Sequence, residues 1–288
     1  MLKLSNNLKN LLFVERNQVK NNLIKQLCNL DKNTPLLIHT DIMKLGILDG
    51  ELDERKFPAK WWETILEASE NRQVIIPTFN YDFTKNGIFD IKKSLGQVGL
   101  LSKYCGIYHS ENRTLTPIFN CCVFNANIDR SPSNNAFGKS SIFHYLFKNN
   151  GVLLFLGTDM RSNTFLHYVE EILNIGYRYL KLFKGIIIND SEKIKIDFLY
   201  RVSPMVNNAV VYDYNKVTND LIKDGLLKFF HIGLSTGLLI KAKDYFYFVE
   251  KRINEDELYL LTNNSRNLIN DLYKKYDRPL TFEKFEGS

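Results

Sequence analysis

The chain has 288 residues, of which 44% are hydrophobic, so it can bury a sizeable core without the support of disulfides or a structural metal. Its 38 Lys and Arg against 32 Asp and Glu give a net charge of +6, which is too small to require a nucleic-acid partner. No apolar run approaches bilayer-spanning length, and the N-terminus lacks the uninterrupted apolar core of a signal peptide, so we expect a soluble, cytoplasmic protein.

Much of the chain alternates between short apolar runs and amphipathic stretches. Apolar runs punctuated by Pro or Gly predict buried strands at residues 35–39, 74–79 and 151–156. Apolar side chains recur at helical spacing in residues 61–66 and 166–173, which predicts a helix over each stretch. Strands that alternate with helices favour parallel crossovers, so we predict an α/β fold in which helices cover both faces of the sheet.

The stretch at residues 180–212 has a different pattern. Two β-rich runs within it are separated by the turn sequence Asn-Asp-Ser, which predicts a small antiparallel insertion. Beyond it, apolar spacing predicts helices at residues 221–230 and 245–253. Because no linker or repeat interrupts the chain, we predict a single domain over residues 1–288. The sequence leaves open whether the insertion covers the functional site or contributes to a homodimer.

The strongest candidate site follows the predicted strand at residues 151–156. That strand ends at a glycine, a polar loop containing Asp159 follows, and a helix begins near Thr164. In open α/β sheets, ligands bind at the carboxyl ends of strands and at the helix N-termini that face them. His167 and Glu170 are three residues apart on this helix, so their side chains share one face and can form a hydrogen bond.

His167 has the properties of a general base. It lies in the first helical turn, where the helix dipole keeps an imidazole neutral, and a carboxylate partner would fix its tautomer. Glu170 can supply that carboxylate from the helix, and Asp159 from the loop. A base of this kind, next to free backbone N–H groups, suits proton removal from a nucleophile that attacks a carbonyl. The spacing alone is also typical of a solvated surface pair.

Other types of site have weaker support. Residues 137–140 (FGKS) end like a phosphate-binding loop, but Ser133 replaces its first glycine and no strand precedes it. Cys121 and Cys122 lie in a β-like run, and we predict that they are buried structural residues. The five histidines are scattered, so we predict no metal site. The aromatic residues follow core patterns, which argues against a nucleic-acid platform.

Four segments resemble the aminoglycoside 3-N-acetyltransferase family, whose members are CoA-dependent N-acyltransferases. Residues 36–46 (LLIHTDIMKLG) are similar to the family's opening strand and turn, and residues 76–79 (IPTF) are similar to its Pro-Thr-Phe strand end. Residues 137–141 resemble its Gly-x-x-Ser loop, which replaces the phosphate-loop interpretation. The strongest resemblance lies in residues 156–170, which include the candidate base.

The resemblance implies a role for several residues of that last segment. Asp159, His167 and Glu170 take the positions of the family's Asp–His–Glu catalytic group. The acceptor amine is expected to attack the thioester directly while His167 removes its proton, with no covalent acyl-enzyme. Thr164 is expected to stabilise the oxyanion, and Asn163 to contact the acceptor.

The resemblance also implies an α/β/α sandwich with a mixed, mostly parallel central sheet. The co-substrate is expected to be acetyl-CoA or another acyl-CoA, and no metal is implied. The pantetheine arm of CoA should pass the first strand-end turn and the Pro-Thr-Phe segment. Five residues are therefore expected near the CoA: His39, Thr40, Asp41, Thr78 and Phe79.

One block departs from the antibiotic-modifying members of the family. Their Arg-Ser-x-His-Pro-x-His-Ser sequence reads RTLTPIFN here, at residues 113–120, so both histidines are absent. The changed block resembles the branch of the family associated with surface-polysaccharide sugar biosynthesis. Within it, we expect Arg113 and Asn120 to bind the acceptor. A net charge of +6 also suits an anionic acceptor better than a polycationic aminoglycoside.

We therefore predict that the protein N-acylates, with an acetyl group as the simplest case, the amine of a nucleotide-linked amino sugar for surface polysaccharide biosynthesis. Two alternatives remain. The first is an aminoglycoside 3-N-acetyltransferase that confers antibiotic resistance. The second, from another functional class, is a catalytically inactive family member that binds CoA.

Overall fold

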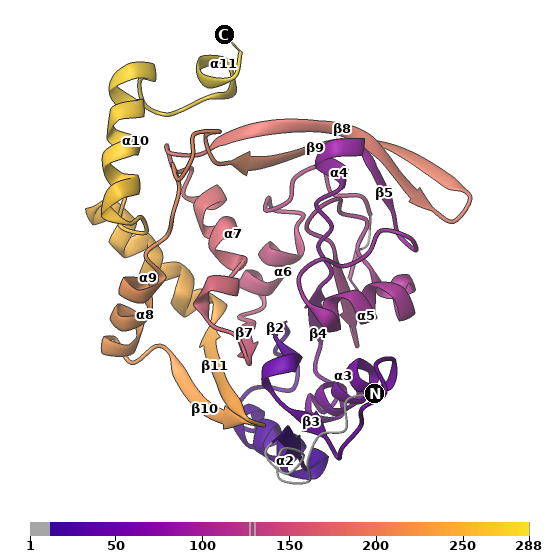
Figure 1. Ribbon diagram of the computed structural model, residues 1–288. Coiled ribbons are helices and arrows are strands. Elements are labelled where there is room, and N and C mark those ends of the chain that lie inside the picture. Colours follow the sequence, from indigo (N-terminus) through magenta and orange to yellow (C-terminus); the bar gives the residue numbers. More distant parts are fainter. Residues whose placement is uncertain (1–11, 127, 130, 288) are drawn as a thin grey trace.

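The computed structural model describes residues 12–126, 128–129 and 131–287, and its centre is a six-stranded sheet (Figure 1). The strand order is β10-β11-β7-β2-β4-β6, in which β7, β2 and β4 are parallel and the outer pairings are antiparallel. The strands span Lys228–Ile232 (β10), Ser235–Lys241 (β11), Val152–Leu156 (β7), Leu36–Thr40 (β2), Val74–Pro77 (β4) and Cys121–Phe124 (β6). Strands are thus confirmed at all three of the predicted positions.

Helices cover both faces of this sheet. Consecutive strand residues point to opposite faces, and on β2 Leu36 and Ile38 enter one hydrophobic core while Leu37 enters the other. The first core is closed by α2 (Arg16–Leu27), α3 (Lys56–Ala68) and α5 (Leu100–Tyr108). The second is closed by α6 (Ile142–Lys148), α7 (Phe165–Ile172), α8 (Tyr214–Lys223) and α9 (Ala242–Glu255).

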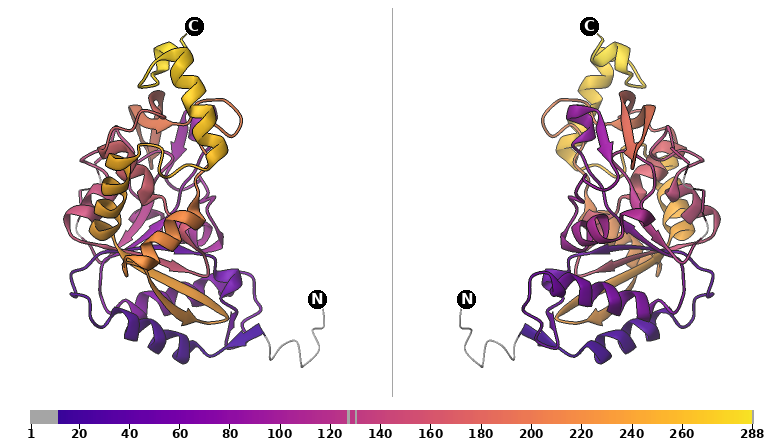
Figure 2. Two further views of the ribbon diagram at one scale, coloured as in Figure 1. Left: turned by 90° about the vertical axis from the view of Figure 1, so that its left-hand side faces the viewer. Right: turned by 90° about the vertical axis from the view of Figure 1, so that its right-hand side faces the viewer.

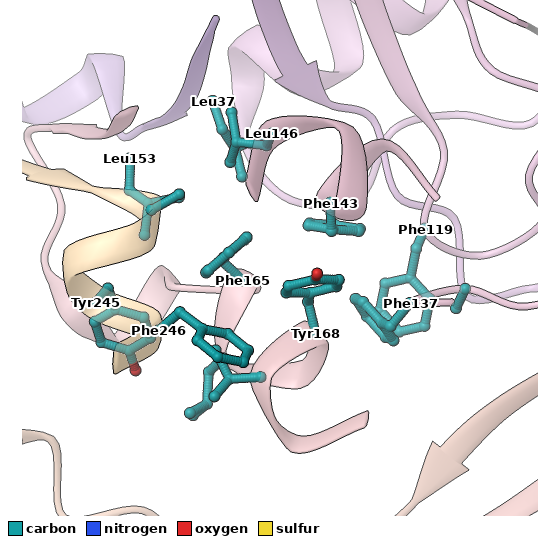
Figure 3. Close-up of a cluster of buried hydrophobic side chains, with 14 of the residues drawn as sticks. Leu37, Phe119, Phe137, Phe143, Leu146, Leu153, Phe165, Tyr168, Tyr245 and Phe246 are labelled. Carbon is teal, nitrogen blue, oxygen red and sulfur yellow. The ribbon is translucent and has the colours of Figure 1, made fainter. Parts of the chain in front are cut away.

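Figure 3 shows part of the second core, where Leu153 of β7 lies close to Phe165 of α7 and Tyr245 of α9. The two cores confirm the predicted α/β/α sandwich. They also confirm the predicted helices at residues 61–66, 166–173 and 245–253, which lie in or overlap α3, α7 and α9.

The predicted antiparallel insertion is a long hairpin, which runs across the top of the molecule in Figure 1. β8 (Tyr179–Asn189) and β9 (Glu192–Val202) pair along their whole length, and β5 (Ile88–Asp90) adds a parallel strand to β8. Residues 203–212 add only an isolated bridge between Tyr212 and Leu261. The chain then closes with α10 (Asn263–Tyr276) and α11 (Phe282–Phe285), at the end of the molecule opposite α2 (Figure 2).

The predicted helix at residues 221–230 is wrong beyond its first three residues. α8 ends at Lys223, and Gly225 follows with φ +67°, a left-handed conformation that terminates helices. The chain then forms β10, in which Phe230 is buried and Phe229 is 47% exposed. Phe229 and Phe230 lie at the end of the stretch whose apolar spacing predicted a helix, whereas in the structure they alternate across a strand.

The remaining elements are short. They are β1 (Phe13–Val14), β3 (Ile47–Leu48), α4 (Phe83–Asn86) and the 3₁₀ turns η1 (Ile42–Lys44), η2 (Ser110–Asn112) and η3 (Met160–Ser162). Cys121 and Cys122 are fully buried in β6, as predicted. Within the part of the chain that the structure describes, no helix combines the length and the apolar character that crossing a membrane requires.

Candidate active site

A cavity of about 260 Å³ lies at the carboxyl ends of β2, β4 and β7. Because these strands are parallel, their ends and the loops that follow them meet at one edge of the sheet. The walls come from the end of β2, from β4 and the segment after it, from α5, from the loop between β7 and α7, from the first turn of α7, and from α8. The lining side chains include His39, Thr40, Phe79, Tyr81, Ser102, Arg161, Asn163, Thr164, His167 and Tyr214.

The turn after β7 depends on Gly157. This residue has φ +69°, and a Cβ atom there would lie 2.6 Å from the carbonyl oxygen of Asp41, in the turn after β2. Only glycine fits both the left-handed conformation and this close approach. After Gly157 the chain forms η3, and Thr164 stands at the N-cap of α7. This path brings the first turn of α7, with His167, to the cavity.

His167 and Glu170 form the predicted pair. The Nδ1 atom of His167 lies 2.9 Å from Oε2 of Glu170. The Glu170 side chain is 1% exposed, whereas that of His167 is 29% exposed and lines the cavity. Since a carboxylate can only accept, Nδ1 carries the proton and Nε2 is left with its lone pair. The ring is thus in the tautomer that a general base requires.

Three further side chains surround the Glu170 carboxylate. Its Oε1 accepts hydrogen bonds from the hydroxyls of Tyr177 at 2.9 Å and Tyr212 at 2.7 Å. Arg178 Nε lies 3.2 Å from Oε2. Burial acts to raise the pKa of Glu170, but the Arg178 charge and the hydrogen bond from His167 outweigh it and lower the pKa to about 2. Glu170 is therefore ionised at neutral pH.

The two histidines of the cavity are neutral at neutral pH. Burial lowers the pKa of His167; the hydrogen bond to Glu170 opposes this shift, and the Arg178 charge adds to it. Burial alone lowers the pKa of His39 to about 3. The His39 ring stacks on Phe155, with 5.2 Å between ring centroids. Neutral His167 can accept a proton, and His39 can take part in hydrogen bonds without a charge.

Asp159 is not the second carboxylate of His167, contrary to the expectation from sequence. Both of its oxygens accept hydrogen bonds from Arg161 Nε, at 2.9 and 3.0 Å, and Oδ1 also accepts from the Arg161 backbone N–H. Among the described residues, no hydrogen bond or ion pair joins Asp159 to His167. Arg161, two residues after Asp159, binds the carboxylate that we expected beside the His167 imidazole. A catalytic role for Asp159 stays a prediction without that contact.

The residues expected near CoA divide into two groups. His39, Thr40 and Phe79 line the cavity together with His167. Thr78 and Asp41 do not line it. Thr78 is fully buried and donates to Oδ1 of Asn120 at 2.7 Å, and Asp41 forms a surface ion pair with Lys44 at 3.0 Å.

Arg113 and Asn120 hold the fold together and do not reach the cavity, which corrects their assignment to acceptor binding. Arg113 is 1% exposed, and its five N–H groups are all used: two donate to Asn120 Oδ1, and three donate to backbone carbonyls. A guanidinium has only five donors, so none remains for a ligand. Asn163 and Thr164, by contrast, do line the cavity, and their roles stay predictions.

Sequence reasoning missed the residues that surround Glu170. Tyr177 and Arg178 lie just before the hairpin, and Tyr212 lies after it. No local motif indicates them, because the fold brings them to α7. A buried carboxylate needs a cation, and Arg178 is eight residues downstream, but the sequence did not show that Glu170 is buried.

Comparisons with known proteins bear on this site. Residues 50–254 match the sequence model of the aminoglycoside 3-N-acetyltransferase family. A search of curated proteins finds no match. Three solved structures are similar in fold: the AAC(3)-IVa apoenzyme (19% identity, TM-score 0.66, 88% of this chain and 96% of that one), YokD from Bacillus subtilis (13%, 0.65, 83% and 94%) and AAC-IIIb in a binary complex with CoASH (16%, 0.63, 83% and 97%).

Proposed function

Because the chain belongs to the aminoglycoside 3-N-acetyltransferase family and is thus an acetyltransferase, we propose that it transfers the acetyl group of acetyl-CoA to a primary amine of an aminoglycoside-type amino sugar. One observation carries the proposal: the neutral His167 on the cavity wall, whose Nδ1 is fixed by the ionised Glu170. This pair is what proton removal from an attacking amine requires.

The cavity suits the reactive end of an acyl-CoA. One wall is apolar, from Ile76, Pro77 and Phe79, and polar groups of His39 and Thr40 lie beside it. The buried Nε2 of His39 has no hydrogen-bond partner among the described residues, so it is free to bind a ligand atom. Acetyl-CoA would supply an activated thioester carbonyl to this site.

His167 carries the proton through the reaction. As the amine nitrogen bonds to the carbonyl carbon, Nε2 of His167 takes the proton that the nitrogen loses. When the C–S bond breaks, the imidazolium returns this proton to the leaving sulfur, so the base is regenerated. Glu170 stabilises the imidazolium between these events, and Thr164, at the N-cap of α7, stabilises the oxyanion through its hydroxyl or its backbone N–H.

The comparisons support an aminoglycoside-type acceptor over the nucleotide-linked amino sugar expected from sequence. The matched family carries the aminoglycoside name, and the similar structures include a mutant of AAC(3)-IVa in complex with a gentamicin and with apramycin, and AAC-VIa bound to sisomicin. A nucleotide-linked amino sugar is the second candidate because of one observation. The described residues that line the cavity include Arg161 but no Asp or Glu, and carboxylates are what a polycationic acceptor would attract.

Release of free thiol from acetyl-CoA in the presence of different acceptors tests the proposal. We expect release with gentamicin, sisomicin or apramycin and none without an acceptor. Release only with nucleotide-linked amino sugars would favour the second candidate. An enzyme that binds CoA but releases no thiol with either pool would contradict both and favour the inactive, CoA-binding alternative.

A further inference from the structure

We propose that Arg178 and Tyr212 are positioning residues, which hold the Glu170 carboxylate so that its Oε2 accepts from Nδ1 of His167. The catalytic consequence of this arrangement rests on the proposed function, but the arrangement itself does not. Tyr177 assists from the same side.

The hydrogen-bond donors around Glu170 hold its carboxylate in a single orientation. A carboxylate offers about four lone-pair sites. Here Oε1 accepts from Tyr177 and Tyr212, while Oε2 accepts from His167 and faces Nε of Arg178. Rotation of the carboxylate would break two tyrosine hydrogen bonds in a site that is 1% exposed, where water cannot replace them. The direction of Oε2, and with it the tautomer of His167, follows from these donors.

Arg178 also fixes the hydroxyl of Tyr212. Its Nη2 donates to the Tyr212 oxygen at 2.7 Å, so the hydroxyl proton is free to point to Glu170, to which it donates at 2.7 Å. The guanidinium lies 5.7 Å from the centre of the Tyr212 ring, and Nη1 donates to the carbonyl of Arg201 at 3.3 Å. Arg178 thus acts on Glu170 directly, through its charge, and indirectly, through Tyr212.

The two ends of the hairpin meet at this carboxylate. Tyr177 and Arg178 immediately precede β8, and Tyr212 lies ten residues after the end of β9. A single side chain of α7 therefore joins the start and the end of the insertion. This gives the insertion a role in the active site although its strands do not line the cavity.

The other titratable side chains near Glu170 are neutral tyrosines, so Arg178 is the neighbouring cation that lowers the pKa values of the pair. Tyr214 of α8 and Tyr245 of α9 interact electrostatically with Glu170, but burial raises the pKa of each, that of Tyr214 to about 12, so both are neutral. The hydroxyls of Tyr177 and Tyr212 are also neutral, for the same reason. Arg178 lowers the pKa values of both members of the His167–Glu170 pair.

An NMR titration of His167 in the free, full-length protein tests the proposal without any acceptor. The variants are Arg178→Met, Arg178→Lys, Tyr212→Phe and Glu170→Gln. Tyr259→Phe is a matched control, since Tyr259 also donates to a partly buried carboxylate, that of Asp220 at 2.7 Å, but makes no hydrogen bond to Glu170. Ring ¹⁵N shifts report the tautomer, and thiol release reports kcat and the KM for acetyl-CoA.

We expect the pKa of His167 to rise in Arg178→Met, which loses the cation, and to fall in Glu170→Gln, which loses the anion. Arg178→Lys should return it towards the wild-type value. In Tyr212→Phe we expect a mixed tautomer and a kcat about tenfold lower, the equivalent of one hydrogen bond to a charged group, at unchanged KM for acetyl-CoA. Tyr259→Phe should match the wild type.

An unchanged His167 pKa in Arg178→Met together with a wild-type tautomer in Tyr212→Phe would overturn the proposal. If Arg178→Met does not fold, the proposal is tested with Arg178→Lys and Tyr212→Phe, and a wild-type tautomer and a wild-type kcat in both would overturn it. Shifts of the His167 pKa in a protein that acetylates no acceptor would contradict the proposed function and leave the positioning role intact.

Discussion

At the scale of single residues, the two carboxylates that we expected beside His167 have different environments. Glu170 is buried and holds the imidazole, whereas the Asp159 side chain is 47% exposed and pairs with Arg161. Exposed ion pairs contribute little because water screens them. Of the three residues that the family resemblance grouped together, His167 and Glu170 form a pair in this chain, whereas Asp159 pairs with Arg161 at the surface.

Substitutions that remove the charge of each carboxylate test whether the two environments differ in their importance for catalysis. We expect Asp159→Asn to lower kcat/KM by at most about fivefold, the equivalent of the ~1 kcal/mol that an exposed ion pair contributes. Glu170→Gln should lower it by about a hundredfold, because the base loses both its orientation and the charge that stabilises the imidazolium. Steady-state thiol release measures both, and a loss in Asp159→Asn as large as that in Glu170→Gln would contradict this division.

At the scale of elements, the turn between β7 and α7 determines where the base lies. Gly157 and Gly225 both have left-handed φ angles, +69° and +67°. A Cβ at Gly157 would collide with the backbone of the β2 turn, while one at Gly225 would meet nothing within 4 Å. The two positions therefore share the conformational strain and differ in the steric clash.

Alanine at the two glycines tests this difference. We expect Gly225→Ala to lower the free energy of unfolding by about 1 kcal/mol, the conformational cost alone. Gly157→Ala should lower it by about 3 kcal/mol, because the β2 turn must also shift, and kcat should fall with it. Urea unfolding provides the measurement. Equal losses of unfolding free energy in the two variants would show that the β2 turn can shift without destabilising the protein, which would contradict this expectation.

The elements also show what could be predicted from sequence. The parallel strands, the hairpin and the spacing of His167 and Glu170 follow from local patterns, and the structure confirms them. β10 was mistaken for helix because two adjacent phenylalanines fit either period. Arg178 and Tyr212 were missed because only the folded hairpin brings them to α7.

At the scale of the whole molecule, Glu170 and Arg178 join the second hydrophobic core to the hairpin sheet. Because the folded-state pKa of Glu170, about 2, is below its ordinary value of 4.5, the ionised carboxylate adds stability above pH 4.5. That contribution is lost as the pH falls from 4.5 through about 2. The size of the Glu170 pKa shift corresponds to a contribution of about 3 kcal/mol to the free energy of unfolding.

Acid unfolding measures this contribution. Between about pH 6 and pH 3, we expect the urea midpoint of the wild type to fall more steeply than that of Glu170→Gln, which has no carboxylate to protonate. The difference reports Glu170 together with its coupling to His167, since the other acidic groups are common to both proteins. Parallel pH curves would show that Glu170 is not held ionised by Arg178 and His167.

The central claim is that His167 takes the proton of an amine attacking acetyl-CoA, and His167→Ala tests it most directly. We expect thiol release to fall by about a hundredfold or more, in line with the loss of a general base, while calorimetry shows acetyl-CoA binding within about twofold of the wild type, well under the ~1.4 kcal/mol of a tenfold change. His231→Ala, at an exposed position on β10, is the matched control and should keep full activity. Retention of most of the activity in His167→Ala, or loss of acetyl-CoA binding in parallel with turnover, would contradict the account.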